Sequence, residues 1–189
     1  ADYIIDLSQF VSSDESFKGH LFYNFSKDYV NKNSDNIELN IQLEHVTNDT
    51  YLKTYKLESP IINNTSILSS SIGIAHNSNF QSLDANINVY EDLSKNDSDK
   101  YEYVPNFYFS KILNDNLVLN SEGYYKNYNT NITEKILIND FEYSSIPTYF
   151  GKGIINQKKL LIKNINSDAK NSNNYKNKSN FNLIPTLQT

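Results

Sequence analysis

The residues from Ile37 to Glu44 alternate strictly between apolar and polar side chains, and this pattern constrains the fold more than any other feature of the chain. A β-strand sends successive side chains to opposite faces of its sheet, so a period of two predicts a strand with one apolar and one polar face. The pattern stops in the polar and aromatic stretch "VTNDTYLKTY", residues 46–55.

The same period recurs along almost the whole chain, and the helical spacing of three and four residues is rarely seen. We therefore predict an all-β, antiparallel up-and-down meander of eight to ten strands, whose connections alternate between short and long. The expected strands are 3–10, 20–26, 37–46, 66–76, 80–90, 101–113, 116–128, 135–145, 158–166 and one that begins at 181.

The polar stretches between these strands are expected to be loops. Residues 93–100 are charged and predict a solvated loop, and 167–180 predict a long mobile loop. The stretch 13–22 begins like a helix cap, but no helical periodicity follows, so we expect a loop there. Proline has no N–H for a ladder, so Pro105 predicts a strand start, an edge strand or a bulge.

Composition excludes several classes of protein. The net charge of −5 predicts no general attraction to nucleic acid, and the lack of cysteine excludes disulfides and thiolate chemistry within these 189 residues. The chain begins with Ala1 and contains no methionine, so we expect a piece of a longer polypeptide. No run of about 18 apolar residues exists, but a barrel strand needs only about 9–11 alternating residues, so a membrane partner stays open.

No arrangement of titratable residues predicts an enzyme. His20, His45 and His76 are far apart and belong to no metal-binding or catalytic pattern, so a surface or interface role is expected for them. Glu38 and Glu44 would lie roughly 20 Å apart on an extended strand, too far for paired-carboxylate hydrolysis. We expect these carboxylates to be solvated, and we expect no catalytic residue, cofactor or metal.

A two-sided meander fits three architectures. A soluble sandwich or jelly roll explains the alternation but not the uneven loops, and a solenoid or adhesin-like repeat remains a third possibility. An outer-membrane barrel combines tight turns at one end with long polar loops at the other, and places aromatic girdles at both interfaces. The fifteen Tyr and ten Phe suit girdles, whereas the absence of Trp departs from them. Girdle candidates are Tyr3, Phe10, Phe25, Tyr29, Tyr51, Tyr55, Phe80, Tyr90, Tyr101, Tyr103 and Tyr128.

A set of ordered landmarks carries a resemblance to a known family. These are Gly19-His20, the segment "VTNDTYL" at residues 46–52, the strand opening "FQSL" at 80–83, and "YVP" at 103–105. Over about residues 19–128 the chain resembles the barrel region of the lipopolysaccharide-assembly protein LptD family, also called the organic solvent tolerance protein family. The order of the landmarks, and no single motif, carries this resemblance.

The resemblance implies an outer-membrane protein of a Gram-negative bacterium that assembles lipopolysaccharide into the outer leaflet and catalyses no covalent chemistry. It implies a barrel of more than two dozen strands, closed by a plug lipoprotein. An N-terminal periplasmic jelly roll would receive lipopolysaccharide from a periplasmic bridge protein. Residues 1–189 would then be an interior part of the barrel domain, and in isolation a curved open sheet, because the jelly roll and the lateral-gate strands lie outside the matched region.

This hypothesis assigns a solvent to each face. The side chains expected to face membrane lipid are Ile37, Leu39, Ile41, Leu43, Leu83, Ile87 and Val89. Those expected to face the lumen are Glu38, Asn40, Gln42, Asp84, Asn86 and Asn88. Two alternatives stay open: a secreted soluble β-sandwich or adhesin module that binds glycans, and another outer-membrane porin or receptor barrel.

Overall fold

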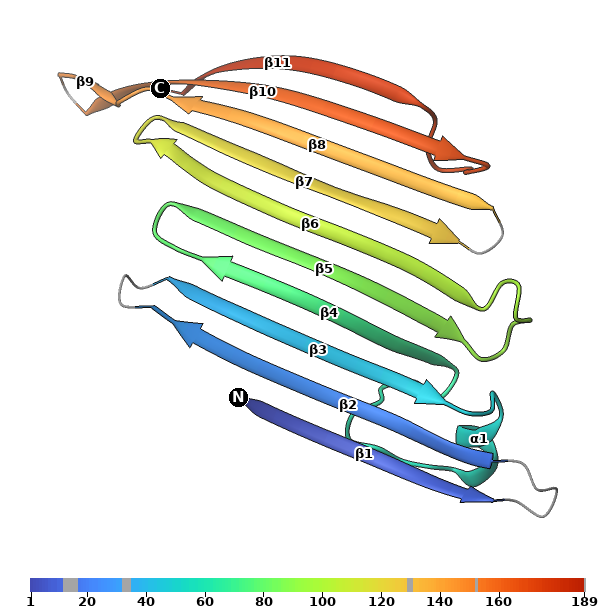
Figure 1. The fold of residues 1–189 in the computed structure, drawn as a ribbon. Coiled ribbons are helices and arrows are strands. Elements are labelled where there is room, and N and C mark those ends of the chain that lie inside the picture. The colour runs from blue at the N-terminus through green and yellow to red at the C-terminus, as the bar shows by residue number, and fades with distance from the viewer. Residues whose placement is uncertain (12–16, 32–34, 129–130, 152, 189) are drawn as a thin grey trace.

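The described part of the chain folds into one long antiparallel sheet (Figure 1). The computed structural model describes residues 1–11, 17–31, 35–128, 131–151 and 153–188. The elements are β1 (Asp2–Val11), β2 (Phe17–Val30), β3 (Asn36–Val46), α1 (Tyr51–Tyr55), β4 (Ile67–Asn77), β5 (Gln81–Asp92), β6 (Tyr101–Asn114), β7 (Leu117–Tyr128), β8 (Ile132–Ser144), β9 (Thr148–Phe150), β10 (Ile154–Lys170) and β11 (Lys178–Gln188).

The strands follow one another across the sheet in chain order. The path runs β1-β2-β3-β4-β5-β6-β7-β8-β10-β11, and the three-residue β9 pairs only with the start of β10. The tight connections 78–80 and 115–116 lie at one end of the strands, together with the β8–β10 connection that contains β9, and the connections 47–66, 93–100 and 171–177 lie at the other (Figure 1). The predicted all-β class and meander order are therefore confirmed, and the second end is called the loop end below.

The register keeps apolar side chains beside one another from strand to strand. Ile41 of β3 lies between Phe25 of β2 and Ile72 of β4, and Ile72 pairs in turn with Ile87 of β5. A slip of one residue would exchange the two faces of a strand, so this matching fixes the pairing of β2 through β5.

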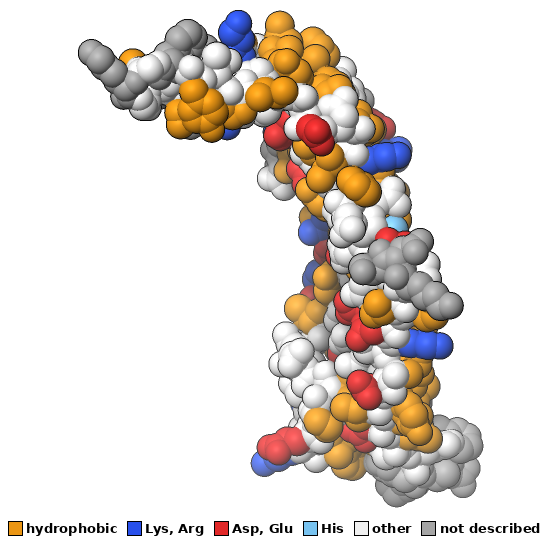
Figure 2. Space-filling view, turned by 90° about the vertical axis from the view of Figure 1, so that its left-hand side faces the viewer, with side chains coloured by type: hydrophobic (Ala, Val, Ile, Leu, Met, Phe, Trp, Pro, Cys, Tyr) orange, Lys and Arg blue, Asp and Glu red, His pale blue; other side chains and the backbone are white. Residues whose placement is uncertain are grey.

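The sheet is bowed into an arc when it is seen edge-on (Figure 2). Asp84 of β5, Glu122 of β7 and Tyr175 of the β10–β11 connection line one common cavity, which places the polar face on the inner side of the bend. In the lower half of Figure 2, hydrophobic side chains gather on the outer, convex side. Over β2 to β6, the sheet therefore presents a polar concave face and an apolar convex face.

The compact core of the chain lies at the loop end, under the 47–66 connection. This connection turns back onto the sheet and contains α1, a single helical turn whose Tyr51 and Leu52 are almost fully buried. The cluster unites side chains of the sheet and of the connections, and its members are Phe22, Val46, Tyr51, Leu52, Ile61, Leu68 and Leu93. Tyr51 is therefore a core residue, which corrects its prediction as a girdle residue.

Gly19 allows β1 and β2 to approach each other beneath this cluster. A Cβ atom at position 19 would lie 2.3 Å from the carbonyl oxygen of Ser8. The backbone of Gly19 also accepts from the Thr47 amide and donates to the Thr47 hydroxyl. Only a residue without a side chain leaves room for both neighbours.

Several predicted boundaries were wrong, because polar residues continue strands that the sequence pattern ended. Residues 167–170 extend β10 and 178–180 begin β11, so only 171–177 of the predicted loop 167–180 lie outside strands. Residues 17–22 belong to β2 and not to a loop, while 12–16 lie outside the described residues. The sequence prediction also missed β9 and α1.

Pro105 lies inside β6, at neither a strand start nor a sheet edge. It pairs with Ile87 of β5. In the ladder between β6 and β7, Tyr103 pairs with Asn127, and the next pair is Asn106 with Tyr124. The ladder skips residues 104 and 105, as expected where proline lacks an N–H. The bulge of this strand lies elsewhere, between Ile112 and Asn114.

Candidate functional site

The two faces of the sheet separate the residues to which different solvents were assigned. Ile41 and Ile87 share the convex face, and Gln42 and Asn88 share the concave face with Ser71 between them in the ladder. Ile87 is 52% exposed and Ile72 is 47% exposed, although both lie in the middle of the sheet. Large aliphatic side chains so far from any edge require a cover that the described residues do not supply.

Carboxylates on the concave face are held by amides two residues along the same strand. Asn40 Nδ2 donates to Glu38 Oε1 at 2.6 Å, and Asn86 Nδ2 donates to Asp84 Oδ1. Residues i and i+2 share a face, so an amide and a carboxylate at this spacing meet without distorting the strand. The pairing orients the charged groups along the concave surface.

Three carboxylates lie at one level across the sheet. The register joins Glu38 to Ala75, Ala75 to Asp84, Asp84 to Tyr108, and Tyr108 to Glu122. Because neighbouring strands lie about 4.8 Å apart, carboxylates on alternate strands are separated by roughly 10 Å. They form a carboxylate row that crosses the concave face perpendicular to the strands.

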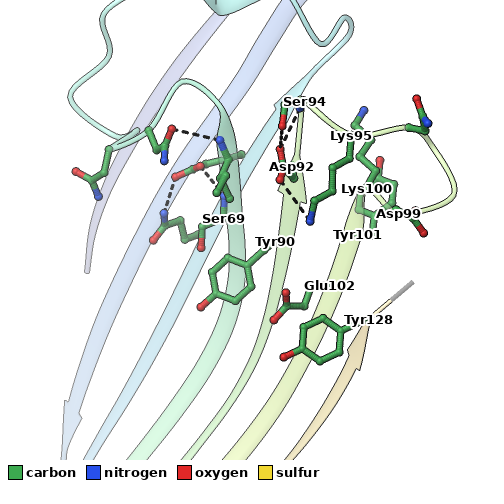
Figure 3. Close-up of a pocket in the computed structure, with 16 residues that line it drawn as sticks. Ser69, Tyr90, Asp92, Ser94, Lys95, Asp99, Lys100, Tyr101, Glu102 and Tyr128 are labelled. Atoms are coloured by element: carbon green, nitrogen blue, oxygen red, sulfur yellow. Dashed lines mark hydrogen bonds and ion pairs between the residues drawn. The ribbon is translucent and has the colours of Figure 1, made fainter. Parts of the chain in front are cut away.

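A polar recess opens at the loop end of the concave face (Figure 3). It has a volume of about 920 Å³, and it is bounded by the ends of β3, β5 and β7, by the starts of β4 and β6, and by the 93–100 connection. Tyr90, Glu102 and Tyr128 line its inner end, and Asp92, Ser94 and Lys95 line its outer end (Figure 3). Aromatic rings beside carboxylates and hydroxyls suit a polar, uncharged ligand better than an anion.

Lys100, at the end of the 93–100 connection, forms ion pairs that join this side of the recess to the 47–66 connection. Its Nζ lies 2.6 Å from Asp49 Oδ1 and 2.7 Å from Glu91 Oε1, and its side chain is only 10% exposed. Burial alone would lower the pKa of Lys100, but the hydrogen bonds and charges of Asp49 and Glu91 outweigh it and raise that pKa above its usual range. Lys100 is therefore a permanently charged clamp between two connections that are far apart in sequence.

Glu44 is buried, which corrects its prediction as a solvated carboxylate. Its Oε1 accepts from Gln42 Nε2 at 2.6 Å, and its Oε2 accepts from the Ser69 amide at 2.7 Å. The β3–β4 ladder ends at Gln42 and Ser71, so this side chain replaces the next backbone contact between the two strands. Glu44 thus has a structural role where β3 and β4 separate around the connection.

His20 is also buried, which corrects its predicted surface or interface role. Its Nε2 lies 3.0 Å from Asp6 Oδ1, its Nδ1 lies 3.0 Å from Ser8 Oγ, and Ser8 Oγ lies 2.6 Å from the Tyr51 hydroxyl. A carboxylate only accepts, so His20 donates from Nε2 to Asp6, and the Ser8 hydroxyl links the His20 ring to the Tyr51 hydroxyl. His45 is exposed and His76 is half-buried on the other face.

These residues resemble a hydrolase triad only in type. The Ser8 oxygen is already bonded to Tyr51, and the His20 ring stacks on Phe22 with centroids 4.5 Å apart. The array therefore anchors α1 to β1 and β2. The sequence could not reveal it, because Tyr51 is 43 residues from Ser8.

Within the part of the chain that the structure describes, no group of three or more His, Asp or Glu side chains is arranged to hold a metal ion. Among the same residues, no helix is both long and apolar enough to cross a membrane. Gly151 and Gly153 lie next to β9, and Gly153 has a positive φ of 84°, a backbone conformation that glycine adopts without steric cost.

Comparison with known proteins gives no relative. No family model matches the chain, no curated protein matches it, and no solved structure matches it. The resemblance to the LptD family therefore rests on the sequence landmarks alone.

Proposed function

We propose that the chain is part of the wall of an outer-membrane β-barrel, and that this barrel assembles lipopolysaccharide into the outer leaflet. The convex face of β2 to β6 would meet membrane lipid, and the concave face would line the lumen. A plug lipoprotein and a periplasmic bridge protein would be its partners, as in the family that the landmarks resemble.

The observation that carries the barrel is the exposed aliphatic face in the interior of the sheet. A soluble sheet buries such a face under helices or a second sheet, because a fully exposed aliphatic side chain forfeits about 1.5–3 kcal/mol of hydrophobic free energy and a half-exposed one about half of that. A bilayer supplies the missing cover over many strands at once. The longest connection, 47–66, lies at the opposite end of the strands from the tight turns 78–80 and 115–116, as in an outer-membrane barrel.

Fractionation of cells that make the intact protein tests the barrel. We expect the protein in the outer-membrane fraction, with detergent needed for its release. Recovery in soluble periplasm or in the medium without detergent would overturn the barrel and favour the secreted glycan-binding module.

Depletion of the protein tests the cargo. If it assembles lipopolysaccharide, depletion should reduce the lipopolysaccharide at the cell surface that is open to an external modifying enzyme, while total lipopolysaccharide stays constant. An unchanged surface level in a protein confirmed as an outer-membrane barrel would reject this cargo and leave the barrel in place.

The carboxylate row of Glu38, Asp84 and Glu122 favours a second candidate, a porin or receptor barrel that passes cations or neutral solutes. Rings of acidic side chains attract cations and repel anions in pores. Single-channel conductance of the intact protein should then favour K⁺ over Cl⁻, and the Asp84→Asn and Glu122→Gln variants should lose most of that preference. A closed channel, or one with no cation preference, would argue against this candidate.

A further inference from the structure

The β10–β11 connection, residues 171–177, folds back across the concave face of the sheet. Asn171 directly follows β10 and has a positive φ of 53°, a left-handed conformation that asparagine tolerates better than most residues. Its Nδ2 donates to the carbonyl oxygen of Asn131, just before β8, at 3.3 Å. This turn directs the chain from β10 toward β8.

Ser172 holds the connection against the concave face. Its hydroxyl donates to Glu134 Oε1 of β8 at 2.5 Å and accepts from the backbone amides of Asn174 and Tyr175 at 3.0 and 3.2 Å. Asn174 Nδ2 also donates to Glu134 Oε1, at 3.4 Å. Glu134 shares the concave face with Lys126, its partner in the ladder, and is only 3% exposed. The connection therefore both covers this carboxylate and is bonded to it.

Tyr175 carries the connection onward to β7. A hydrogen bond joins its side chain to that of Tyr124, and both residues line the cavity that also contains Glu122. The connection therefore leaves β10, crosses β8 and reaches β7, a distance of roughly 10 Å across the strands. Tyr124 is four residues from the end of β7, so it lies about 13 Å from the loop end along that strand. We call residues 171–177 the inward strap.

The inward strap is also fixed where the chain returns to the sheet. Ser167 Oγ of β10 donates to the carbonyl oxygen of Lys176 at 2.7 Å, and the amide of Ala169 donates to Asn177 Oδ1 at 2.8 Å. The strap is thus bonded to β10 as well as to β8 and β7.

The 47–66 connection covers the other flank of the same face. The Tyr51 hydroxyl lies 2.6 Å from Ser8 Oγ, and the Tyr51 ring centroid lies 5.8 Å from that of His20. The register places both Ser8 and His20 on the concave face. At the loop end, the concave face is therefore covered over β1 to β3 and over β7 to β10, and the polar recess opens between these two covers.

We propose that the inward strap narrows the lumen at its loop end and limits the size of the hydrophilic solutes that pass. In a closed barrel, a segment on the concave face occupies part of the cross-section, and the width of a pore decides which solutes it admits. Solutes then pass between the strap and the 47–66 connection, through the recess. The proposal rests on the proposed barrel, since only a closed wall gives the strap a lumen to narrow.

A pair of introduced cysteines tests the position of the strap. Ser172→Cys with Glu134→Cys brings two thiols within reach of dibromobimane, which fluoresces strongly once it bridges them. Any other cysteine of the intact protein is first replaced by serine. The matched control is Ser172→Cys with Lys135→Cys, because Lys135 follows Glu134 in β8 but lies on the convex face, with its Nζ 3.4 Å from Asp168 Oδ2.

Bridging should be at least about fivefold greater in the first pair, because neighbouring residues of a strand point to opposite faces. Equal bridging in the two pairs would overturn the inward position of the strap.

Liposome swelling tests the limit on size. Ser172→Ala with Tyr175→Ala removes the bonds to Glu134 and Tyr124 and should release the strap. The intact protein is reconstituted into liposomes, and swelling is measured with maltose and with maltoheptaose. We expect release to raise the rate for maltoheptaose at least about fivefold and the rate for maltose less, because the width of a pore matters most for the larger solute.

The matched control is Ser179→Ala with Tyr125→Ala. These residues lie on the convex face of β11 and β7, outside the lumen, so the control should swell at the wild-type rate with both sugars. A rise in the control equal to that in the release variant would overturn the proposal.

The two proposals fail in different ways. If the protein is soluble without detergent, the barrel fails and the strap proposal fails with it. If the protein is membrane-embedded but the release variant leaves the maltoheptaose rate unchanged, the strap proposal alone is overturned.

Discussion

The two halves of the sheet distribute polar side chains differently. In β2 to β6, the convex face is built mainly from aliphatic and aromatic side chains, and carboxylates and amides keep largely to the concave face. In β7 to β11, Ser121, Asn139 and Asn164 lie on the convex face, and Ile138 and Ile165 lie on the concave one. The first half thus separates two environments, and the second half mixes them.

The mixed half compensates through hydrogen bonds between side chains. Ser121 Oγ donates to Asn139 Oδ1 at 2.8 Å, and Asn166 Nδ2 donates to Asn164 Oδ1 at 2.5 Å. In an apolar solvent a polar side chain is tolerated when its hydrogen bonds are made within the protein. One sheet can thus be specified by segregated faces in one part and by hydrogen-bonded polar pairs in another.

The largest expected effect is a lysine in the middle of the segregated convex face. In the proposed barrel, Ile41→Lys should destabilise the intact protein in a bilayer by about 2–4 kcal/mol, because the charge would enter hydrocarbon. Gln42→Lys, one residue along on the concave face, should cost well under 1 kcal/mol. Unfolding in urea from lipid vesicles measures both, and equal costs would show that the faces do not meet different solvents.

The connections of the two halves should differ in how strongly they are anchored to the sheet. Leu52 is only 1% exposed, so Leu52→Ala should cost about 2–3 kcal/mol and open the 47–66 connection to protease. In the second half, Ser172→Ala removes one 2.5 Å bond to the buried Glu134 and should cost about 1 kcal/mol. Equal protection of the 47–66 connection in wild type and Leu52→Ala would contradict its anchoring by the core.

The ion pairs of Lys100 in the first half and Lys135 in the second should also differ in how much they stabilise the fold. Lys100→Gln leaves Asp49 and the buried Glu91 without their cation and should cost about 1–3 kcal/mol. Lys135→Gln breaks an exposed pair and should cost about 0.5 kcal/mol or less. Comparison of urea midpoints measures this contrast.

The clamp also predicts a pH dependence. The raised pKa of Lys100 means that its contribution is complete at every pH below about 10.4, the usual lysine value, and is lost only as the pH rises through the higher folded value. The stability difference between wild type and Lys100→Gln should therefore stay constant from pH 6 to pH 9. A decrease within that range would show that another group carries the effect.

The smallest expected effect is the difference between two Ser–Asn hydrogen bonds that lie on opposite faces of the sheet. Ser121→Ala breaks the convex bond to Asn139, and Ser110→Ala breaks the 2.7 Å concave bond to Asn120. We expect about 1 kcal/mol for the convex bond and about 0.5 kcal/mol or less for the concave one, where water can replace it. A reversed order would place water on the convex face.

The sequence predicted the strands, their order and the two faces of the first half, because a period of two is a local signal. It failed where the structure depends on distant partners. Glu44 occupies a polar position of the alternating pattern, yet its side chain is buried and accepts a hydrogen bond from the Ser69 amide. His20 contacts Tyr51 only because the 47–66 connection turns back over the sheet. Strands with mixed faces, such as β10, were predicted too short because polar residues near their ends, such as Ser167 and Asp168, bond to neighbouring segments.

The meander order has a consequence for how the chain folds. Apart from the three-residue β9, every strand pairs with strands that precede or follow it directly in sequence. Apart from the long 47–66 connection, each step of assembly therefore closes a short loop, whose entropic cost is small, and the edge of the growing sheet offers the template for the next strand. The sheet can therefore form hairpin by hairpin, starting from any pair of neighbouring strands.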